Sequence, residues 1–260
     1  MNRSKTTNAM PDDLRRQLQF LKLSFILEHF EELARQAGSE QWSHVEFLAR
    51  LIEGEAALRQ DRARQRRIQQ ARFPVLKTLE PFDFTWPTKI NRLAVQNLFR
   101  LKFIEEKANV ILIGGVGLGK THLAIALGWA ACQAGPRVRF ATAIDIINGL
   151  SAAQNAGRLV KELKEYTRPE LLIVDELGYL PIDKRGADLL FQVVAARYES
   201  GSIVLTTNRA FREWGTLFDV DNTLATALID RLMHHGEALV IKGDSYRMKD
   251  KDNPADPPSA

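Results

Sequence analysis

The sequence predicts an α/β fold, in which a five-stranded parallel sheet carries helices on both faces and follows a small, all-helical N-terminal domain. Two observations support this prediction. From residue 109 onward, five short and almost wholly apolar segments alternate with longer segments of helical spacing, as parallel strands buried on both faces do. Before residue 76, apolar residues recur only at helical spacing.

The N-terminal domain, residues 1–75, is expected to contain two helices. A first helix that ends at Gly38 is predicted by apolar residues at helical spacing: Leu14, Leu18, Leu21, Phe25, Ile26, Phe30 and Leu33. Ser43 and Glu46 form a capping-box pattern that predicts the start of the second helix. This helix is expected to end near Ala71, because the proline of Phe73-Pro74 disfavours helix before it.

The rest of the chain divides into three parts. Residues 76–107 are expected to form an ordered linker, with prolines and aromatic residues at 80–87, and a helix at about 92–106. Residues 108–248 form the main domain, with strands predicted at 110–113, 138–141, 171–175, 203–206 and 238–241. Its helices are predicted at 121–133, 144–153, 159–166, 187–199 and 222–234. The Pro- and Asp-rich tail, residues 249–260, is expected to be disordered.

Composition narrows the class of protein. The chain has 260 residues, a net charge of +4 and a charged fraction of 26%, which are ordinary values for a globular protein. Cys132 is the only cysteine, so we expect no internal disulfide and a reducing, cytoplasmic setting. No segment approaches the ~18 apolar residues that span a bilayer, and the N-terminal segment lacks the apolar stretch of a secretory signal. We therefore expect no membrane partner.

A glycine-rich loop stands between the first predicted strand and the helix after it. Its sequence, GGVGLGKT at 114–121, fits G-x-x-x-x-G-K-[ST]. Such a loop wraps a phosphate with backbone N–H groups, its lysine reaches the β- and γ-phosphates, and its last hydroxyl ligates Mg²⁺. We therefore predict ATP and Mg²⁺ as ligands, with the nucleotide held by Gly114, Gly115, Val116, Gly117, Leu118, Gly119, Lys120, Thr121 and His122. His122 is expected to pack or cap rather than to catalyse.

Two later strands end in polar residues that suit hydrolysis. Asp175 and Glu176 end the apolar strand LLIVDE, which should place both carboxylates beside the phosphate loop. Asp175 is predicted to hold Mg²⁺ together with Thr121, and Glu176 to act as general base on the attacking water. Asn208 ends the strand SIVLTTN and is predicted to orient that water. The alternatives are ordinary strand-terminal acids and an asparagine that begins a turn.

Two arginines near the C-terminus are candidates for stabilising transition-state charge. Arg231 lies on the predicted helix after the Asn208 strand, and an arginine that serves this purpose can come from a neighbouring subunit. The alternative is a surface arginine paired with Asp230 or Glu237. Arg247 is a second cationic candidate for contacting the nucleotide, with a weaker case because it lies after the last predicted strand.

These motifs stand in the order of Walker A, Walker B, sensor 1 and arginine finger in the AAA+ superfamily. Two longer phrases, RYESGSIVLTTNRAFREWGTLF (197–218) and ALIDRLMHHGEALVIKGDSYRMK (227–249), resemble the IstB family. These are transposition helper ATPases related to the helicase loader DnaC and the initiator DnaA. The resemblance runs from about residue 14 to 249. Many AAA+ proteins carry a helical lid with a sensor 2 arginine after the fifth strand. Only a short stretch follows Ile241 here, so we expect the lid to be absent or minimal, which leaves the role of Arg247 open.

The resemblance implies an ATPase that forms a homo-oligomer on double-stranded DNA, captures target DNA, and recruits and stimulates a transposase. A DnaC-like helicase loader is the first alternative, although the two phrases favour transposition. The second is a scaffold that binds ATP without hydrolysing it, against which Glu176, Asn208 and Arg231 argue.

Basic residues in two segments are candidates for contacting DNA phosphates rather than for reading bases. Arg59, Arg62 and Arg66 share one face of the second predicted helix. The remaining candidates are Arg64 and Arg67 on that helix, and Arg158, Lys161 and Lys164 between the second and third strands. The alternative in both segments is a solvated basic face. His234 and His235 are adjacent at the end of the helix predicted at 222–234, and because adjacent residues on a helix point about 100° apart, we expect no two-histidine metal site.

Overall fold

The structure is a computed structural model that describes residues 10–86, 89–218 and 222–246. Arg247 and the tail at 249–260 lie outside the described residues. The chain divides into two compact units, Met1–Arg66 and Arg67–Ala260, and the division falls within a helix.

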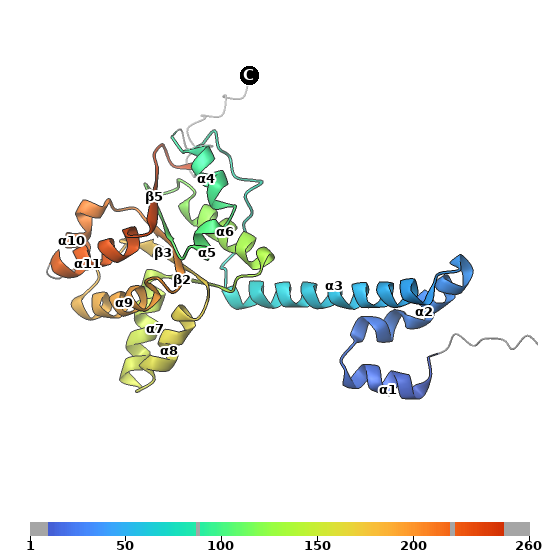
Figure 1. The fold of residues 1–260 in the computed structure, drawn as a ribbon. Helices are drawn as coiled ribbons and strands as arrows, with labels where there is room; N and C mark the ends of the chain where they lie inside the picture. Colours follow the sequence, from blue (N-terminus) through green and yellow to red (C-terminus); the bar gives the residue numbers. More distant parts are fainter. Residues whose placement is uncertain (1–9, 87–88, 219–221, 247–260) are drawn as a thin grey trace, which may run out of the picture. The chain divides into compact units, whose positions relative to one another are not determined.

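The first unit is helical (Figure 1). It contains α1 (Asp12–Phe20), α2 (Ser24–Glu40) and most of α3 (His44–Ala71). Leu18, Ile26 and Leu51 come from three different helices and are buried together in its small core. The Ser43 hydroxyl accepts a hydrogen bond from the Glu46 N–H at 3.1 Å, which confirms the predicted start of α3.

The single helix predicted across 14–37 is wrong in two respects. The chain breaks between α1 and α2, where Lys22 adopts a positive φ of 57°. Leu18 and Ile26 lie on opposite sides of this break and both face the core, so the apolar spacing continues through the turn. The second helix also passes through Gly38 and ends at Glu40, because Gln41 takes the left-handed conformation that the glycine was expected to supply.

The second unit is built on a five-stranded parallel sheet, as predicted. Its strands are β1 (Asn109–Gly114), β2 (Val138–Thr142), β3 (Leu171–Leu177), β4 (Ser202–Thr207) and β5 (Gly236–Ile241). They stand in the order β2-β3-β4-β1-β5, and every neighbouring pair is parallel. The carboxyl ends of β1, β3 and β4 therefore meet at one edge of the sheet.

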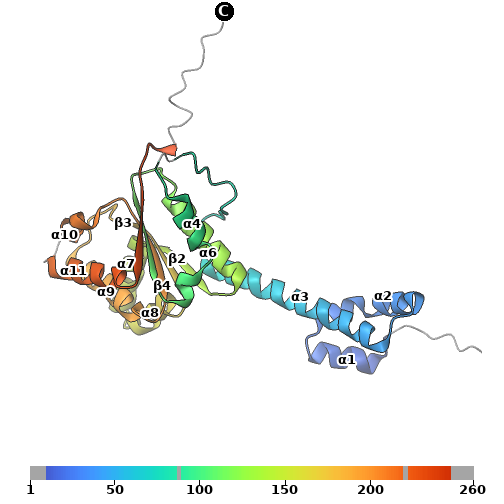
Figure 2. The ribbon, with the colours of Figure 1, turned by 45° about the horizontal axis from the view of Figure 1, so that its top comes forward.

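Helices cover both faces of this sheet (Figures 1 and 2). The core on one face is formed with α7 (Ala143–Asn155), α8 (Leu159–Thr167), α9 (Lys184–Arg197), α10 (Trp214–Leu217) and α11 (Asn222–Met233). The core on the other face is formed with α4 (Arg92–Leu98), α5 (Lys102–Glu105) and α6 (Lys120–Ala134). Neighbouring residues of one strand join opposite cores: Ile111 joins the first, and Leu112 the second.

Two further expectations concern the ends of the second unit. The helix predicted at 92–106 is broken into α4 and α5, because Leu101 takes a positive φ of 59°. After β5, no α-helix follows within the described residues up to Tyr246. Over the described ranges, no helix is long and apolar enough to cross a bilayer.

Candidate active site

The loop between β1 and α6 has the geometry of a phosphate cradle. Gly117 and Gly119 take positive φ angles of 76° and 82°, which are strained for residues with a side chain. Lys120 begins α6, is 5% exposed, and donates from Nζ to the Gly115 carbonyl at 2.6 Å. The lysine ammonium is therefore held inside the loop, where helix N-terminal N–H groups and the helix dipole favour an anion.

Thr121 and Asp175, the predicted Mg²⁺ ligands, lie in hydrogen-bond contact. The Thr121 hydroxyl lies 2.9 Å and 3.1 Å from the two carboxylate oxygens of Asp175. Asp175 is 3% exposed and also receives a hydrogen bond from the Thr206 hydroxyl. A hydroxyl and a buried carboxylate next to a phosphate cradle are hard oxygen ligands that suit Mg²⁺, so these residues fit the ion.

A distortion of β3 places the side chain of Glu176 at the protein surface. Its φ is +60°, and the pairing of β3 with β4 shifts register between Val174 and Leu177. The backbone N–H of Glu176 donates to the Thr206 hydroxyl at 2.9 Å, and its side chain is exposed at the cavity wall. Such strained backbone persists where surrounding contacts hold it and is concentrated at functional sites. Sequence reasoning missed Thr206, although the polar ending of its apolar strand was a signal for it.

Asn208 follows β4, which lies between β1 and β3. Its Oδ1 atom is buried and has no hydrogen-bond partner in the described part of the chain. Because buried acceptors are normally satisfied, this oxygen is suited to a water or ligand group that the protein alone does not supply. The structure thus brings the carboxyl ends of β1, β3 and β4 together, as the sequence predicts for Lys120, Asp175 and Asn208.

A cavity of about 510 Å³ opens from the phosphate loop. The segment after α3 contributes part of its wall: Val75, Lys77, Pro81, Phe82, Asp83 and Trp86. Phe82 packs closely on the loop, since a side chain at Gly119 would approach its ring to 2.7 Å. Tyr246 lines the cavity too, and its N–H donates to the Gly117 carbonyl at 3.0 Å. Sequence reasoning predicted a packed linker here but did not assign it to the site.

His122 packs at this wall, as expected. Its Nε2 atom lies 2.7 Å from the Thr78 carbonyl oxygen, and its ring meets that of Phe82 edge-on at 5.4 Å. His122 therefore fixes the start of α6 to the linker that forms the apolar part of the cavity.

Arg231 is not brought to the phosphate loop of its own chain. It lies near the end of α11, where its guanidinium stacks on Phe191 at 4.7 Å and donates to the Ala227 carbonyl at 3.3 Å. The neighbouring Leu232 carbonyl accepts from Asn109, the first residue of β1. The phosphate loop follows the last residue of β1, about 20 Å along a six-residue strand.

The predicted DNA contacts fall into two groups. Arg59, Arg62, Arg64 and Arg67 are engaged within the chain, by Glu55, Ser24, Asp61 and the Cys132 carbonyl respectively. Arg66 and the residues Arg158, Lys161 and Lys164 of α8 and its cap are exposed. None of these four has an ion pair within the described residues, so their charge is available to a partner.

Comparison with known proteins agrees with this geometry. Residues 16–254 match the family described as IstB-like ATP binding protein. The chain belongs to this family. It is 44% identical to the ATP-binding protein named for insertion sequence IS21 of Pseudomonas aeruginosa, over 90% of this chain and 88% of the relative. A counterpart named for insertion sequence IS5376 of Geobacillus stearothermophilus is 41% identical, over 89% of this chain and 92% of the relative.

Two solved structures have a fold similar to that of this IstB-like chain. The DnaC helicase loader aligns with a TM-score of 0.53 at 23% identity, over 64% of this chain and 96% of that protein. DnaA from Aquifex aeolicus, solved with AMPPCP, aligns with a TM-score of 0.54 at 23% identity, over 68% of this chain and 55% of that protein. These are AAA+ proteins, and the likeness to them concerns the fold.

Proposed function

We propose that this IstB-like protein hydrolyses ATP with Mg²⁺, assembles with other copies on double-stranded DNA, and recruits and stimulates a transposase. One observation carries the hydrolytic part: Thr121, Asp175 and Glu176 converge beside the phosphate loop, with a Thr206 hydroxyl joining the two carboxylate residues. A site that only bound nucleotide would not need an exposed carboxylate on distorted backbone at this place.

Each residue then has a distinct role. The loop N–H groups and Lys120 would bind the β- and γ-phosphates, and the apolar wall at Phe82 would contact the base. Mg²⁺, held by Thr121 and Asp175, would neutralise charge on the phosphates. Glu176 would accept the proton of the attacking water, and Asn208 would orient that water through its unpartnered Oδ1. Arg231, on the opposite edge of the sheet, would act on the nucleotide of a neighbouring copy.

The DNA and transposase roles rest on different support. Relatives more than 40% identical are named for insertion sequences, whereas the helicase loader shares 23% identity and the fold. The exposed cations of Arg66 and α8 suit phosphate contacts that carry no base specificity. These observations favour transposition over helicase loading. A pull-down with the transposase and with the replicative helicase separates the two, since each function predicts capture of one partner.

Paired variants test the hydrolytic site. Lys120→Ala removes the charge that binds the phosphates, so ATP binding should be lost while the circular dichroism spectrum stays unchanged. Glu176→Gln should keep ATP binding and lower the rate of phosphate release at least about tenfold, equivalent to about 1.4 kcal/mol of barrier. Phosphate release is measured with and without duplex DNA. The exposed Lys102→Ala is the matched control and should behave as wild type.

The same phosphate-release measurements distinguish the proposed ATPase from a nucleotide-gated scaffold. A wild-type protein that binds ATP but releases no phosphate, with or without DNA, would be such a scaffold. Normal hydrolysis by Glu176→Gln would remove Glu176 from the mechanism while leaving the phosphate loop in place.

A further inference from the structure

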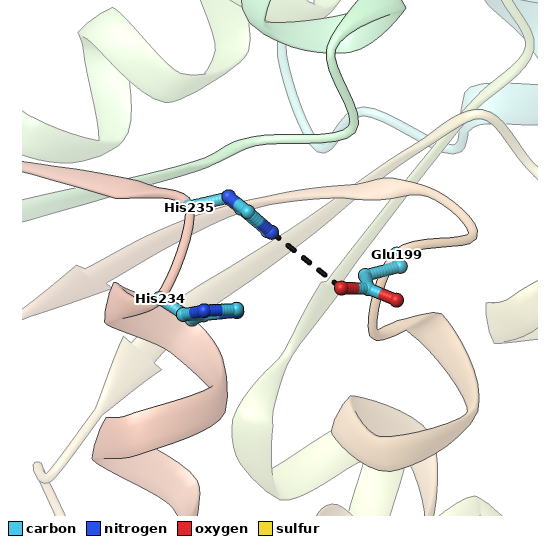
Figure 3. Close-up of side chains that lie close together, drawn as sticks. All are labelled: Glu199, His234 and His235. Carbon is cyan, nitrogen blue, oxygen red and sulfur yellow. Dashed lines mark ion pairs between the residues drawn. The ribbon is translucent and has the colours of Figure 1, made fainter.

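Two histidines and a glutamate meet at the edge of the sheet opposite the phosphate loop (Figure 3). Glu199 comes from the turn between α9 and β4, and His234 and His235 from the turn between α11 and β5. The His235 Nε2 atom lies 3.5 Å from a Glu199 carboxylate oxygen. One donor atom from each of the three side chains lies within 4.8 Å of the other two.

The rings of His234 and His235 lie close together, although the sequence predicted that they would point apart. That expectation applied helix geometry to both, but α11 ends at Met233, before either histidine. The two rings therefore lie on a turn, with centroids 4.2 Å apart and planes inclined by 45°. The expected angle of about 100° applies only within a regular helix, so the argument against a two-histidine site no longer holds.

Backbone hydrogen bonds hold the two turns in place. The His234 N–H donates to the Asp230 carbonyl at 2.9 Å, and the His235 carbonyl accepts from the Asn109 N–H at 3.1 Å. On the other side, Glu199 has a positive φ of 56°, and the N–H groups of Ser200 and Gly201 both donate to the Arg197 carbonyl. The three ligand candidates therefore project from backbone that is fixed by contacts outside the cluster.

Tyr198 orients the ring of His234. Its hydroxyl lies 2.6 Å from His234 Nδ1, and the two rings stack at 5.7 Å. With Nδ1 engaged, Nε2 is the nitrogen of His234 that remains for a ligand. A hydrogen bond to the second ring nitrogen is the arrangement found around most histidines that bind metals.

We propose that Glu199, His234 and His235 bind one divalent transition-metal ion of the zinc class. Imidazole nitrogens and a carboxylate oxygen are ligands that Zn²⁺ accepts at about 2.0–2.2 Å, with a water completing a tetrahedral shell. The donor atoms stand somewhat farther apart than such a shell requires, and exposed side chains can close that gap by small rotations. Mg²⁺ prefers an all-oxygen shell, so this site is chemically distinct from Thr121 and Asp175.

The ion would add a further link between two turns that already meet through the contacts of Tyr198 with His234 and of Glu199 with His235. It would link the end of α9 to the end of α11, beside Arg231 at the edge remote from the phosphate loop. Binding to the folded state alone would then stabilise this edge by mass action. The inference is independent of ATP hydrolysis, because none of the three residues belongs to the nucleotide site.

Titration of tag-free, metal-stripped protein with Zn²⁺ in the absence of nucleotide tests the site. Calorimetry should show one ion per chain, Co²⁺ should give the visible absorption of a tetrahedral site, and Zn²⁺ should raise Tm. Glu199→Gln and His235→Asn should each weaken binding by more than the about 10- to 100-fold typical of losing an outer-shell partner. Tyr198→Phe should weaken it by about tenfold. His44→Asn, an exposed histidine in the first unit, is the control and should bind as wild type.

Two outcomes would overturn the proposal. One is wild-type protein that binds no Zn²⁺ at stoichiometric concentrations. The other is a Glu199→Gln/His234→Asn/His235→Asn protein, folded by circular dichroism, that still binds one ion with wild-type affinity, since the ion would then lie elsewhere.

Discussion

Thr206 connects the two acidic residues of β3 by a single hydroxyl. It donates to the Asp175 carboxylate and accepts from the Glu176 N–H. Because Asp175 is buried, the hydrogen bond to its carboxylate is worth more than one on the surface. The hydroxyl therefore holds the register shift that separates the buried carboxylate of Asp175 from the exposed one of Glu176.

Replacing this hydroxyl tests that role. Thr206→Val keeps the shape of the side chain but leaves the Glu176 N–H and one Asp175 oxygen with one partner fewer. We expect the free energy of unfolding to fall by about 1–3 kcal/mol, and kcat for ATP hydrolysis to fall more than ATP affinity. Denaturant unfolding and phosphate release measure the two effects. Thr206→Ser retains the hydroxyl and should preserve kcat, so equal losses in both variants would contradict the assigned role.

Two buried arginines, Arg197 and Arg139, differ in how well their guanidinium groups are hydrogen-bonded. Arg197 donates to four backbone carbonyls, those of Tyr166, Pro169, Glu170 and Ser202. Burial lowers its pKa to about 10, so it stays charged at neutral pH. Arg139 is 9% exposed, and its Nε and Nη1 atoms have no hydrogen-bond partner within the described residues. It lines a second cavity of about 520 Å³ that it shares with Thr121, Asp175 and Glu176.

Methionine substitutions should separate these two arginines. Arg197→Met leaves four carbonyls without their donor, and we expect it to lower the free energy of unfolding by about 3–5 kcal/mol. Arg139→Met removes a charged group whose buried N–H groups lack full hydrogen bonding. We therefore expect the free energy of unfolding to stay nearly the same or to rise modestly. Chemical denaturation at neutral pH measures both. A loss for Arg139→Met as large as that for Arg197→Met would mean that the cavity supplies Arg139 with a strong partner.

At this scale, the sequence predicts residues whose role depends on local pattern. The phosphate loop, Asp175 and Asn208 are identified because a strand and its terminal residues fix their place at the sheet edge. Phe82 and Thr206 depend on contacts between distant segments, and periodicity carries no information about such contacts. His234 and His235 were misjudged for the related reason that a helix end shifted by one residue changes the direction of both rings.

Within the first unit, some arginines of α3 stabilise the fold, and others are exposed to solvent. Arg59 pairs with Glu55, which is 4% exposed, and donates to the carbonyls of Leu21 and Lys22 at the end of α1. Hydrogen bonds from Arg59 and the Phe25 backbone outweigh the effect of burial and lower the pKa of Glu55. The same helix then presents Arg66 without an ion pair among the described residues.

Single substitutions on α3 should separate its expected role in DNA binding from its role in stability. Arg66→Ala should weaken binding to all duplex sequences about equally, and flatten the slope of log affinity against log salt by nearly one unit for each phosphate that Arg66 neutralises. Arg59→Ala should instead lower thermal stability, because it leaves a buried carboxylate unpaired. Binding isotherms at several salt concentrations, with melting curves, measure both. An unchanged salt slope for Arg66→Ala would remove α3 from the DNA surface and leave Arg158, Lys161 and Lys164 of α8 and its cap as the next candidates.

The helices also show where sequence periodicity stops being informative. The five strands and the helices α6, α7, α8, α9 and α11 were predicted to within a few residues, because each has one apolar face or a wholly apolar run, whereas the short α10 was not predicted. The breaks at Lys22 and Leu101 were missed, because in both places a non-glycine residue takes a positive φ and the apolar pattern continues across the turn. No turn residue marks such a break in the sequence.

For the whole second unit, the parallel sheet separates two groups of candidate residues. The phosphate loop and the acidic residues of β3 stand at the carboxyl ends of the strands, whereas Arg231 stands at the end of α11, near the first residue of β1. The strand between them measures about 20 Å, which an arginine side chain cannot bridge. If Arg231 contributes to hydrolysis, it must therefore do so in the site of a second copy of the chain.

Mixing two inactive variants tests this arrangement. Arg231→Ala should bind ATP about as well as wild type but hydrolyse it slowly, since an arginine of this kind can be worth ~10³-fold or more in rate. Lys120→Ala has the opposite defect, a failed phosphate site with an intact arginine. In a mixed assembly on duplex DNA, some interfaces join an intact phosphate site to an intact arginine, and there hydrolysis should return.

Co-assembly is first verified by co-purification of differently tagged variants. Because Arg231 also stacks on Phe191, Arg231→Lys serves as the control that keeps the charge. Co-assembled variants that regain no phosphate release would contradict a role in trans, and the distance along β1 would then leave Arg231 as a packing residue of α11.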